Sequence, residues 1–159
     1  MLLLLRILWL PSAVLAVTLG WIGLDRAMGW HGLQLLRVGR LLVLLGLVLA
    51  VWCAALFLLI GKGSPHPFVV KTKHLVTSGP YRYVRNPMMW GVGSIITGLA
   101  FWLGSVGLWF GFACFLLFVR CFVPGYEERD MERRFGEEYR EYCRRVPRWW
   151  PRFSRPKTR

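Results

Sequence analysis

The sequence predicts an all-α integral membrane protein with about four transmembrane helices and an amphipathic helix at its C-terminal, cytoplasmic end. Of its 159 residues, 55% are hydrophobic, and the mean hydropathy is +0.44. These apolar residues gather in long blocks, and most charges lie between and after the blocks. A membrane-spanning helix needs about 20 apolar residues, because each residue adds about 1.5 Å across a hydrocarbon core about 30 Å thick.

Three apolar blocks provide the predicted spans. Leu2–Trp21 contains a single charge, Arg6, and Leu41–Ile60 contains none. Pro87–Val119 has no charge over 33 residues. The first two blocks are one span each, and the third is long enough for two short or tilted spans that turn near Trp102–Gly107. The first block is expected to be a retained span, because it lacks the positive n-region and the clear cleavage site of a secretory signal.

The rest of the chain connects or follows these blocks. Residues 21–40 are predicted to form a connector, with an interfacial helix or the start of the second span at 33–40. We therefore divide the chain into N-terminal transmembrane helices at 1–60 and a second region at 61–159. The second region contains a polar loop at 61–86, a helical hairpin at 87–123 and a tail at 124–159.

The net charge of +13 indicates how the chain is oriented. The tail 124–159 holds eleven Lys/Arg and seven Asp/Glu, and the loop 61–86 holds five Lys/Arg and no acid. Basic segments beside spans mark the cytoplasmic side and meet anionic lipid. Four spans place this loop, this tail and both termini on one side. Membrane lipid is therefore the expected partner, and nucleic acid is not.

The tail is predicted to form one amphipathic helix at Tyr126–Arg145. Glu and Arg fill one face, and the other holds apolar and aromatic residues at spacings of three and four, namely Met131, Phe135, Tyr139 and Tyr142. The arginines are expected to form a solvated face that pairs with the glutamates. After Pro147, the adjacent Trp149 and Trp150 have the character of an interfacial anchor. The four cysteines form no CxxC pair or Cys/His cluster, so we expect no metal site and no disulfide framework.

The loop contains the first candidate for chemistry. Ser78–Tyr81 is a turn that is expected to direct Tyr81 and Tyr83 back at the protein, with a lipid-facing position as the equal alternative for Tyr83. Pro87 suits the first turn of a new helix, since its missing N–H is not needed there. Asn86 stands where that helix begins, and free backbone N–H groups at such a position can meet an anion.

A pair of carboxylates follows the last span. Glu127 and Glu128 are predicted to begin the tail helix, where the helix dipole favours acidic groups. This structural interpretation competes with a functional one, in which one carboxylate binds a cation or an amine. Arg85 is expected to pair with one of the two.

Both segments resemble the isoprenylcysteine carboxyl methyltransferase family and its phospholipid methyltransferase relatives. The resemblance covers about residues 61–153, and it implies that 61–159 is a methyltransferase-like catalytic region with its cofactor loop at 61–86 and a cytoplasmic tail at 124–159. It rests on the order Leu75-Val-x-x-Gly-x-Tyr-x-x-x-Arg-Asn-Pro87, an apolar hairpin, Glu127-Glu-x6-Phe-Gly-x-x-Tyr-x-x-Tyr142, and Val-Pro. Either half alone is moderate evidence, and both halves in this order across a hairpin are strong evidence.

The resemblance implies S-adenosylmethionine as cofactor, bound at the cytoplasmic surface without a dinucleotide-binding domain. The implied cofactor contacts are Lys73, His74, Leu75, Val76, Tyr81, Asn86, Pro87, Met88, Met89 and Glu127. The implied catalytic positions are Glu127, Tyr81 and Arg120. A carboxylate and aromatic faces suit the cations of this cofactor, and backbone N–H groups and basic side chains suit its carboxylate.

The chain differs from the isoprenylcysteine enzymes at two positions. Asn86 stands where they have histidine, a variant that resembles bacterial relatives, so a bacterial inner membrane is the expected location. They also have an arginine near the position of Val123, and the arginine closest to that position here is Arg120. These differences concern the acceptor rather than the cofactor.

The prediction is methyl transfer from S-adenosylmethionine to a lipophilic or membrane-associated acceptor, which is an isoprenylcysteine-like carboxylate, a thiol or an amine. One alternative is an NADPH-dependent enzyme similar to the membrane sterol reductases, which share the Arg-His-Pro region. Another is a non-catalytic membrane protein of the same architecture. The sequence leaves the oligomeric state open.

Overall fold

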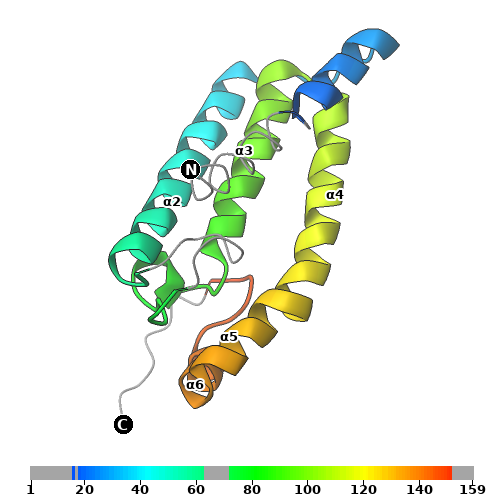
Figure 1. The fold of residues 1–159 in the computed structure, drawn as a ribbon. Coiled ribbons are helices and arrows are strands. Elements are labelled where there is room, and N and C mark those ends of the chain that lie inside the picture. Colours follow the sequence, from blue (N-terminus) through cyan, green and yellow to red (C-terminus); the bar gives the residue numbers. More distant parts are fainter. Residues whose placement is uncertain (1–15, 17, 63–71, 152–159) are drawn as a thin grey trace, which may run out of the picture. The chain divides into compact units, whose positions relative to one another are not determined.

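The computed structural model describes residues 16, 18–62 and 72–151 (Figure 1). Most of the predicted first span, Leu2–Trp21, lies outside the described residues. Every regular element in the described ranges is helical, as the sequence predicts. Residues 18–28 are helical, and the named elements are α2 Leu36–Leu59, the 3-10 helix η1 Gly79–Arg82, α3 Pro87–Leu103, α4 Val106–Phe122, the π-helix η2 Val123–Glu127, α5 Glu128–Phe135 and α6 Glu137–Arg145.

Two of the described helices are long and apolar enough to cross a membrane. One is α2, and the other is the continuous helix Val106–Phe135, which includes α4, η2 and α5. The third apolar helix, α3, has 17 residues, or about 25 Å at 1.5 Å per residue. The predicted connector at 21–40 is wrong in part, since 21–28 are helical. Its last part is the start of the second apolar helix, as one of the two alternatives has it, because α2 begins at Leu36.

The chain forms two compact units. One combines Met1–Val48 with Gly91–Phe118, and the other combines Leu49–Trp90 with Val119–Arg159. We call them the glycine unit and the loop unit, after the glycine contacts of the first and the loop 72–86 of the second. Each is described by itself.

In the glycine unit, α2 and α3 lie side by side with their backbones in close approach (Figure 1). A Cβ added at Gly39 would lie 2.5 Å from the backbone N of Trp102. One added at Gly98 would lie 2.7 Å from the backbone N of Val43. Small residues allow such contacts between helices in membranes, where packing replaces the hydrophobic effect as the driving force.

Replacing Gly98 with alanine is expected to lower the free energy of unfolding by about 1–3 kcal/mol, because backbone atoms must move to admit the methyl group. Gly23→Ala is the matched control, since a Cβ there meets nothing within 4 Å. It should be neutral or stabilising, because alanine favours a helix by about 1 kcal/mol over glycine. Thermal unfolding in detergent, followed by circular dichroism, compares the two. Equal effects would contradict the close packing.

The hairpin turns where the sequence predicts, between Leu103 and Val106. Gly104 has φ +63°, in the left-handed region that glycine adopts without strain. Ser105 then caps α4, since its Oγ accepts the Leu108 N–H at 3.1 Å. Asp25 completes the cap from the helix at 18–28: it accepts the Gly107 N–H at 2.8 Å and the hydroxyl of Ser105.

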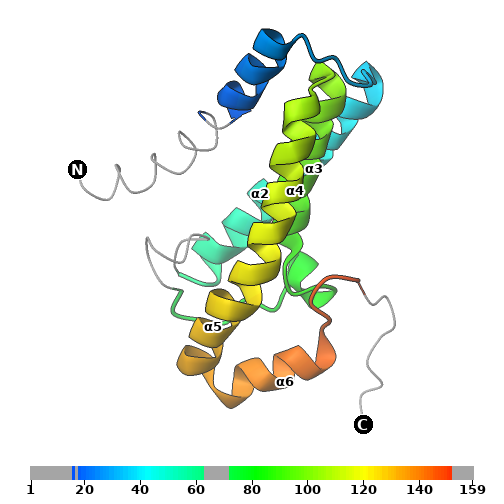
Figure 2. The same cartoon turned by 90° about the vertical axis from the view of Figure 1, so that its right-hand side faces the viewer.

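In the loop unit, the predicted helix Tyr126–Arg145 is two helices. Gly136, with φ +54° and ψ −123°, separates α5 from α6, so α6 leaves in a new direction (Figure 2). The aromatic residues of the two helices still meet in one cluster. Tyr139, Tyr142 and Val146 are buried, and Met131 and Phe135 of α5 pack against them together with Leu75 of the loop.

The second difference concerns Pro124. The sequence predicts that a separate tail helix begins at Tyr126. Instead, α4 continues through η2 into α5 without a break. Proline lacks an N–H and its ring collides with the preceding turn, and the wider π-turn accommodates both defects. Glu127 therefore lies inside a continuous helix rather than at a free N-terminus, so the predicted dipole effect does not apply to it.

Candidate functional site

A pocket lies within the loop unit. Its empty volume is about 450 Å³, which includes space open to solvent. Residues from α2, the loop, the π-turn, α5 and α6 line it, namely Phe57, Thr72, Leu75, Val76, Tyr81, Arg85, Asn86, Glu127, Glu128, Met131, Tyr139 and Tyr142.

Tyr81 forms the aromatic side of the pocket. It is buried with Cys53 and Val76, and its ring meets Phe57 edge-on with the centroids 5.4 Å apart. The Tyr142 hydroxyl donates to the Tyr81 carbonyl at 2.7 Å and so joins α6 to the loop. Tyr81 therefore faces the protein as predicted, whereas Tyr83 is 43% exposed.

The phenols of the pocket are neutral at physiological pH. Burial raises the pKa of Tyr81, Tyr139 and Tyr142 above the ordinary tyrosine value. These side chains can therefore offer aromatic faces and hydroxyl donors to a ligand. They do not act as bases.

Glu127 is the acidic group of the pocket. Its Oε2 is buried and has no hydrogen-bond partner among the described residues. Burial, with a further contribution from the charge of Glu128, raises the pKa of Glu127 to about 7. The residue lies five positions beyond the end of α4, outside the apolar stretch of that helix. A buried carboxylate oxygen without a hydrogen-bond partner is costly, and a cationic ligand would remove that cost.

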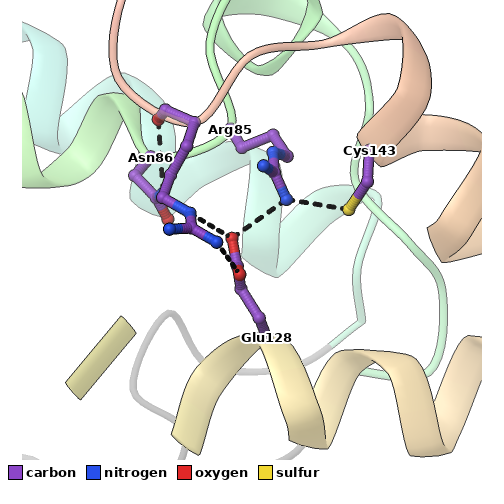
Figure 3. Close-up of polar contacts among 5 residues, drawn as sticks. Arg85, Asn86, Glu128 and Cys143 are labelled. Atoms are coloured by element: carbon purple, nitrogen blue, oxygen red, sulfur yellow. Dashed lines mark hydrogen bonds and ion pairs between the residues drawn. The ribbon is translucent and has the colours of Figure 1, made fainter. Parts of the chain in front are cut away.

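Glu128 has the opposite environment (Figure 3). Its Oε1 accepts from Arg85 Nη1 at 2.9 Å and from Arg148 Nε at 2.8 Å, and Arg148 Nη2 contacts its other oxygen. Arg85 Nη1 also lies 2.8 Å from Cys143 Sγ. The sequence allows Arg85 to pair with Glu127 or Glu128, and the structure shows the pair with Glu128.

The chain after α6, residues 146–151, accepts hydrogen bonds from the loop and from α3. We call it the C-terminal segment. Three donors reach its carbonyl groups: the Arg85 N–H contacts Pro147 O at 2.9 Å, Asn86 Nδ2 contacts Arg148 O at 3.3 Å, and Trp90 Nε1 contacts Trp149 O at 3.0 Å. Asn86 therefore uses its side-chain amide to hold this segment.

The structure gathers five of the eleven residues implied by the resemblance around the pocket, namely Leu75, Val76, Tyr81, Asn86 and Glu127. Pro87 is fully buried at the start of α3, and Met88 packs against the buried cluster of Cys53, Val76 and Tyr81. The remaining implied residues do not line the pocket: Lys73, His74 and Arg120 are exposed, and Met89 is half-buried.

Arg134 is an exception to the solvated face expected of the tail arginines, since its side chain is only 18% exposed. Its Nη2 donates to the carbonyl and the hydroxyl of Thr72, at 2.6 and 2.7 Å, while Nη1 contacts Asp130 at 3.0 Å. The Asp130 pair has a sequence signal, because the residues are four apart in a helix. The contacts of Thr72, and those of Arg148 with Glu128, have no local signal.

A family model described as phospholipid methyltransferase matches residues 35–138. This chain belongs to the phospholipid methyltransferase family. The match runs from the start of α2 to the start of α6 and includes Tyr81, Asn86 and Glu127. An uncharacterised protein of Haemophilus influenzae is similar, with 38% identity over 55 residues, which are 35% of this chain and 87% of that protein. No solved structure matches the chain significantly.

The stability of this phospholipid methyltransferase family member is expected to depend on Glu127. Since its pKa is raised in the folded state, the protein loses stability as pH rises from about 4.5 through 7. The loss is of the order of 3 kcal/mol by pH 8. Glu127→Gln should remove this slope, so that it is more stable than the unmodified protein at pH 8 and similar at pH 4.5.

Thermal unfolding between pH 4.5 and 8.5 measures the effect. Glu138→Gln makes the same chemical change at an exposed position of α6 and serves as control. If Glu127→Gln and Glu138→Gln alter the pH profile equally, Glu127 is not the buried acid described above.

Proposed function

We propose that this chain transfers a methyl group from S-adenosylmethionine, bound at the Glu127 pocket, to a lipophilic or membrane-associated acceptor. Family membership supports the methyl transfer. The observation that supports this cofactor is that Oε2 of Glu127 has no hydrogen-bond partner among the described residues, in a pocket lined by tyrosines. The acceptor class is an isoprenylcysteine-like carboxylate, a thiol or an amine.

The charges of the pocket fit this cofactor. S-adenosylmethionine carries a sulfonium, an ammonium and a carboxylate. Glu127 and the faces of the aromatic rings suit a cation, and Arg85 offers Nε, a buried donor without a partner among the described residues. The pocket includes space open to solvent, into which the cofactor would extend.

The cofactor supplies an electrophilic methyl group. A lone pair of the acceptor forms the new bond to carbon, the electrons of the carbon–sulfur bond return to sulfur, and S-adenosylhomocysteine leaves. A carboxylate or thiolate acceptor needs no protein base, whereas an amine must first lose its proton. The residues of the pocket would therefore act by orienting the two reactants and excluding water.

The topology we propose has four spans in a bacterial inner membrane, with the pocket on the cytoplasmic side. The five basic residues of loop 61–86 and the basic tail support this orientation. The cofactor would enter from the aqueous phase and the acceptor from the bilayer.

Calorimetric titration of the purified chain in detergent tests the proposal, with S-adenosylmethionine, S-adenosylhomocysteine and NADPH as ligands. Binding of the first two without NADPH is the expected result. Binding of NADPH alone would favour an enzyme similar to the sterol reductases. Binding of none would leave a non-catalytic membrane protein and overturn the proposal.

A further inference from the structure

The two adjacent carboxylates at the end of the π-turn differ in their partners, although they have the same side chain. Both residues line the pocket. We propose that Glu128 is a positioning residue that holds the neighbouring arginines and thereby leaves Glu127 free for the cation of the methyl donor. This inference rests on the proposed function.

The distribution of charge carries the argument. The side chains of Arg85 and Glu128 are 14% and 17% exposed, and that of Arg148 is 37% exposed. Both guanidinium groups contact Glu128, and Oε2 of Glu127 has no hydrogen-bond partner among the described residues. A guanidinium group on Glu127 would supply the counter-charge internally and compete with a cationic ligand for the same oxygen.

The surroundings of the pocket contain further titratable groups, on each element packed there. They are Cys53 of α2, Tyr81 and Arg85 of the loop, Glu128, Asp130 and Arg134 of α5, Tyr139, Tyr142 and Cys143 of α6, and Arg148 of the C-terminal segment. Each arginine of this set already has a partner. Arg85 and Arg148 pair with Glu128, and Arg134 pairs with Asp130 and hydrogen-bonds to Thr72.

The two arginines of Glu128 differ in how they are held. Arg85 keeps two other contacts without Glu128, because its side chain lies against Cys143 Sγ and its N–H donates to Pro147 O. Among the described residues, the guanidinium group of Arg148 donates hydrogen bonds to Glu128 alone. Arg148 is therefore the cation that removal of the Glu128 charge would release beside Glu127.

The test measures the affinity of the full-length protein for S-adenosylmethionine between pH 6 and 8.5. The unmodified protein should bind more tightly as pH rises, since the carboxylate form of Glu127 is the one that binds. Glu128→Gln should bind about tenfold more weakly at pH 8 and lose most of this pH dependence, because the released Arg148 keeps Glu127 ionised throughout.

The double variant Glu128→Gln/Arg148→Gln distinguishes positioning from a general loss of structure. It should recover most of the affinity and the pH dependence, and Glu128→Asp should retain both. If Glu128→Gln binds like the unmodified protein, or if it binds weakly and the double variant recovers nothing, the inference is wrong. Absence of binding by the unmodified protein would instead overturn the proposed function.

Discussion

Glu127→Gln is expected to weaken the binding of S-adenosylmethionine about a hundredfold at pH 8. Loss of one partner from a buried, hydrogen-bonded charge pair costs about 3 kcal/mol, and each 1.4 kcal/mol is about tenfold in affinity. The difference should narrow below pH 6, because the raised pKa of Glu127 leaves the carboxyl protonated there. Calorimetric titration across this pH range measures both effects.

Glu138→Gln is the control for this prediction, since it removes an exposed carboxylate of the neighbouring helix α6. It should bind the cofactor like the unmodified protein at every pH. If Glu127→Gln also binds normally at pH 8, the cofactor site lies elsewhere, and membership of the methyltransferase family is unaffected.

Asp25→Ala is expected to lower the free energy of unfolding by about 3 kcal/mol. Asp25 is 6% exposed and accepts hydrogen bonds from the Gly107 N–H and the Ser105 hydroxyl at the start of α4. Its removal leaves two buried donors unpaired, and such groups cost about 1–3 kcal/mol each. Denaturation in mixed micelles, followed by tryptophan fluorescence, measures the change.

Two further variants test the reason for the Asp25 effect. Asp25→Asn keeps an oxygen acceptor and should lose less stability than Asp25→Ala. Ser105→Ala removes the second half of the same cap. The double variant should therefore lose less free energy of unfolding than the sum of the losses in the two single variants. A strictly additive pair would show that the two side chains act independently.

Much of the fold follows from local patterns. Charge-free apolar blocks predict α2 and the α3–α4 hairpin, because a long apolar stretch in a membrane must satisfy its backbone as a helix. Pro87 marks the start of α3, because its fixed φ suits a first helical turn. The predictions at Gly136 and Pro124 are wrong, because a helical pattern of side chains continues through a broken or widened turn without a change in spacing.

The sequence by itself determined the apolar helices, the family resemblance and the pairing of the loop motif with the Glu127–Glu128 motif. The resemblance names Glu127 rather than Glu128, but the residues themselves do not separate the two glutamates, since adjacent identical residues carry the same local signal. Only the tertiary structure decided that Glu128 holds arginines 43 and 20 positions away and that Oε2 of Glu127 has no described partner. The physical reason is that the environment of a charge is set by groups that the fold brings together from distant parts of the chain.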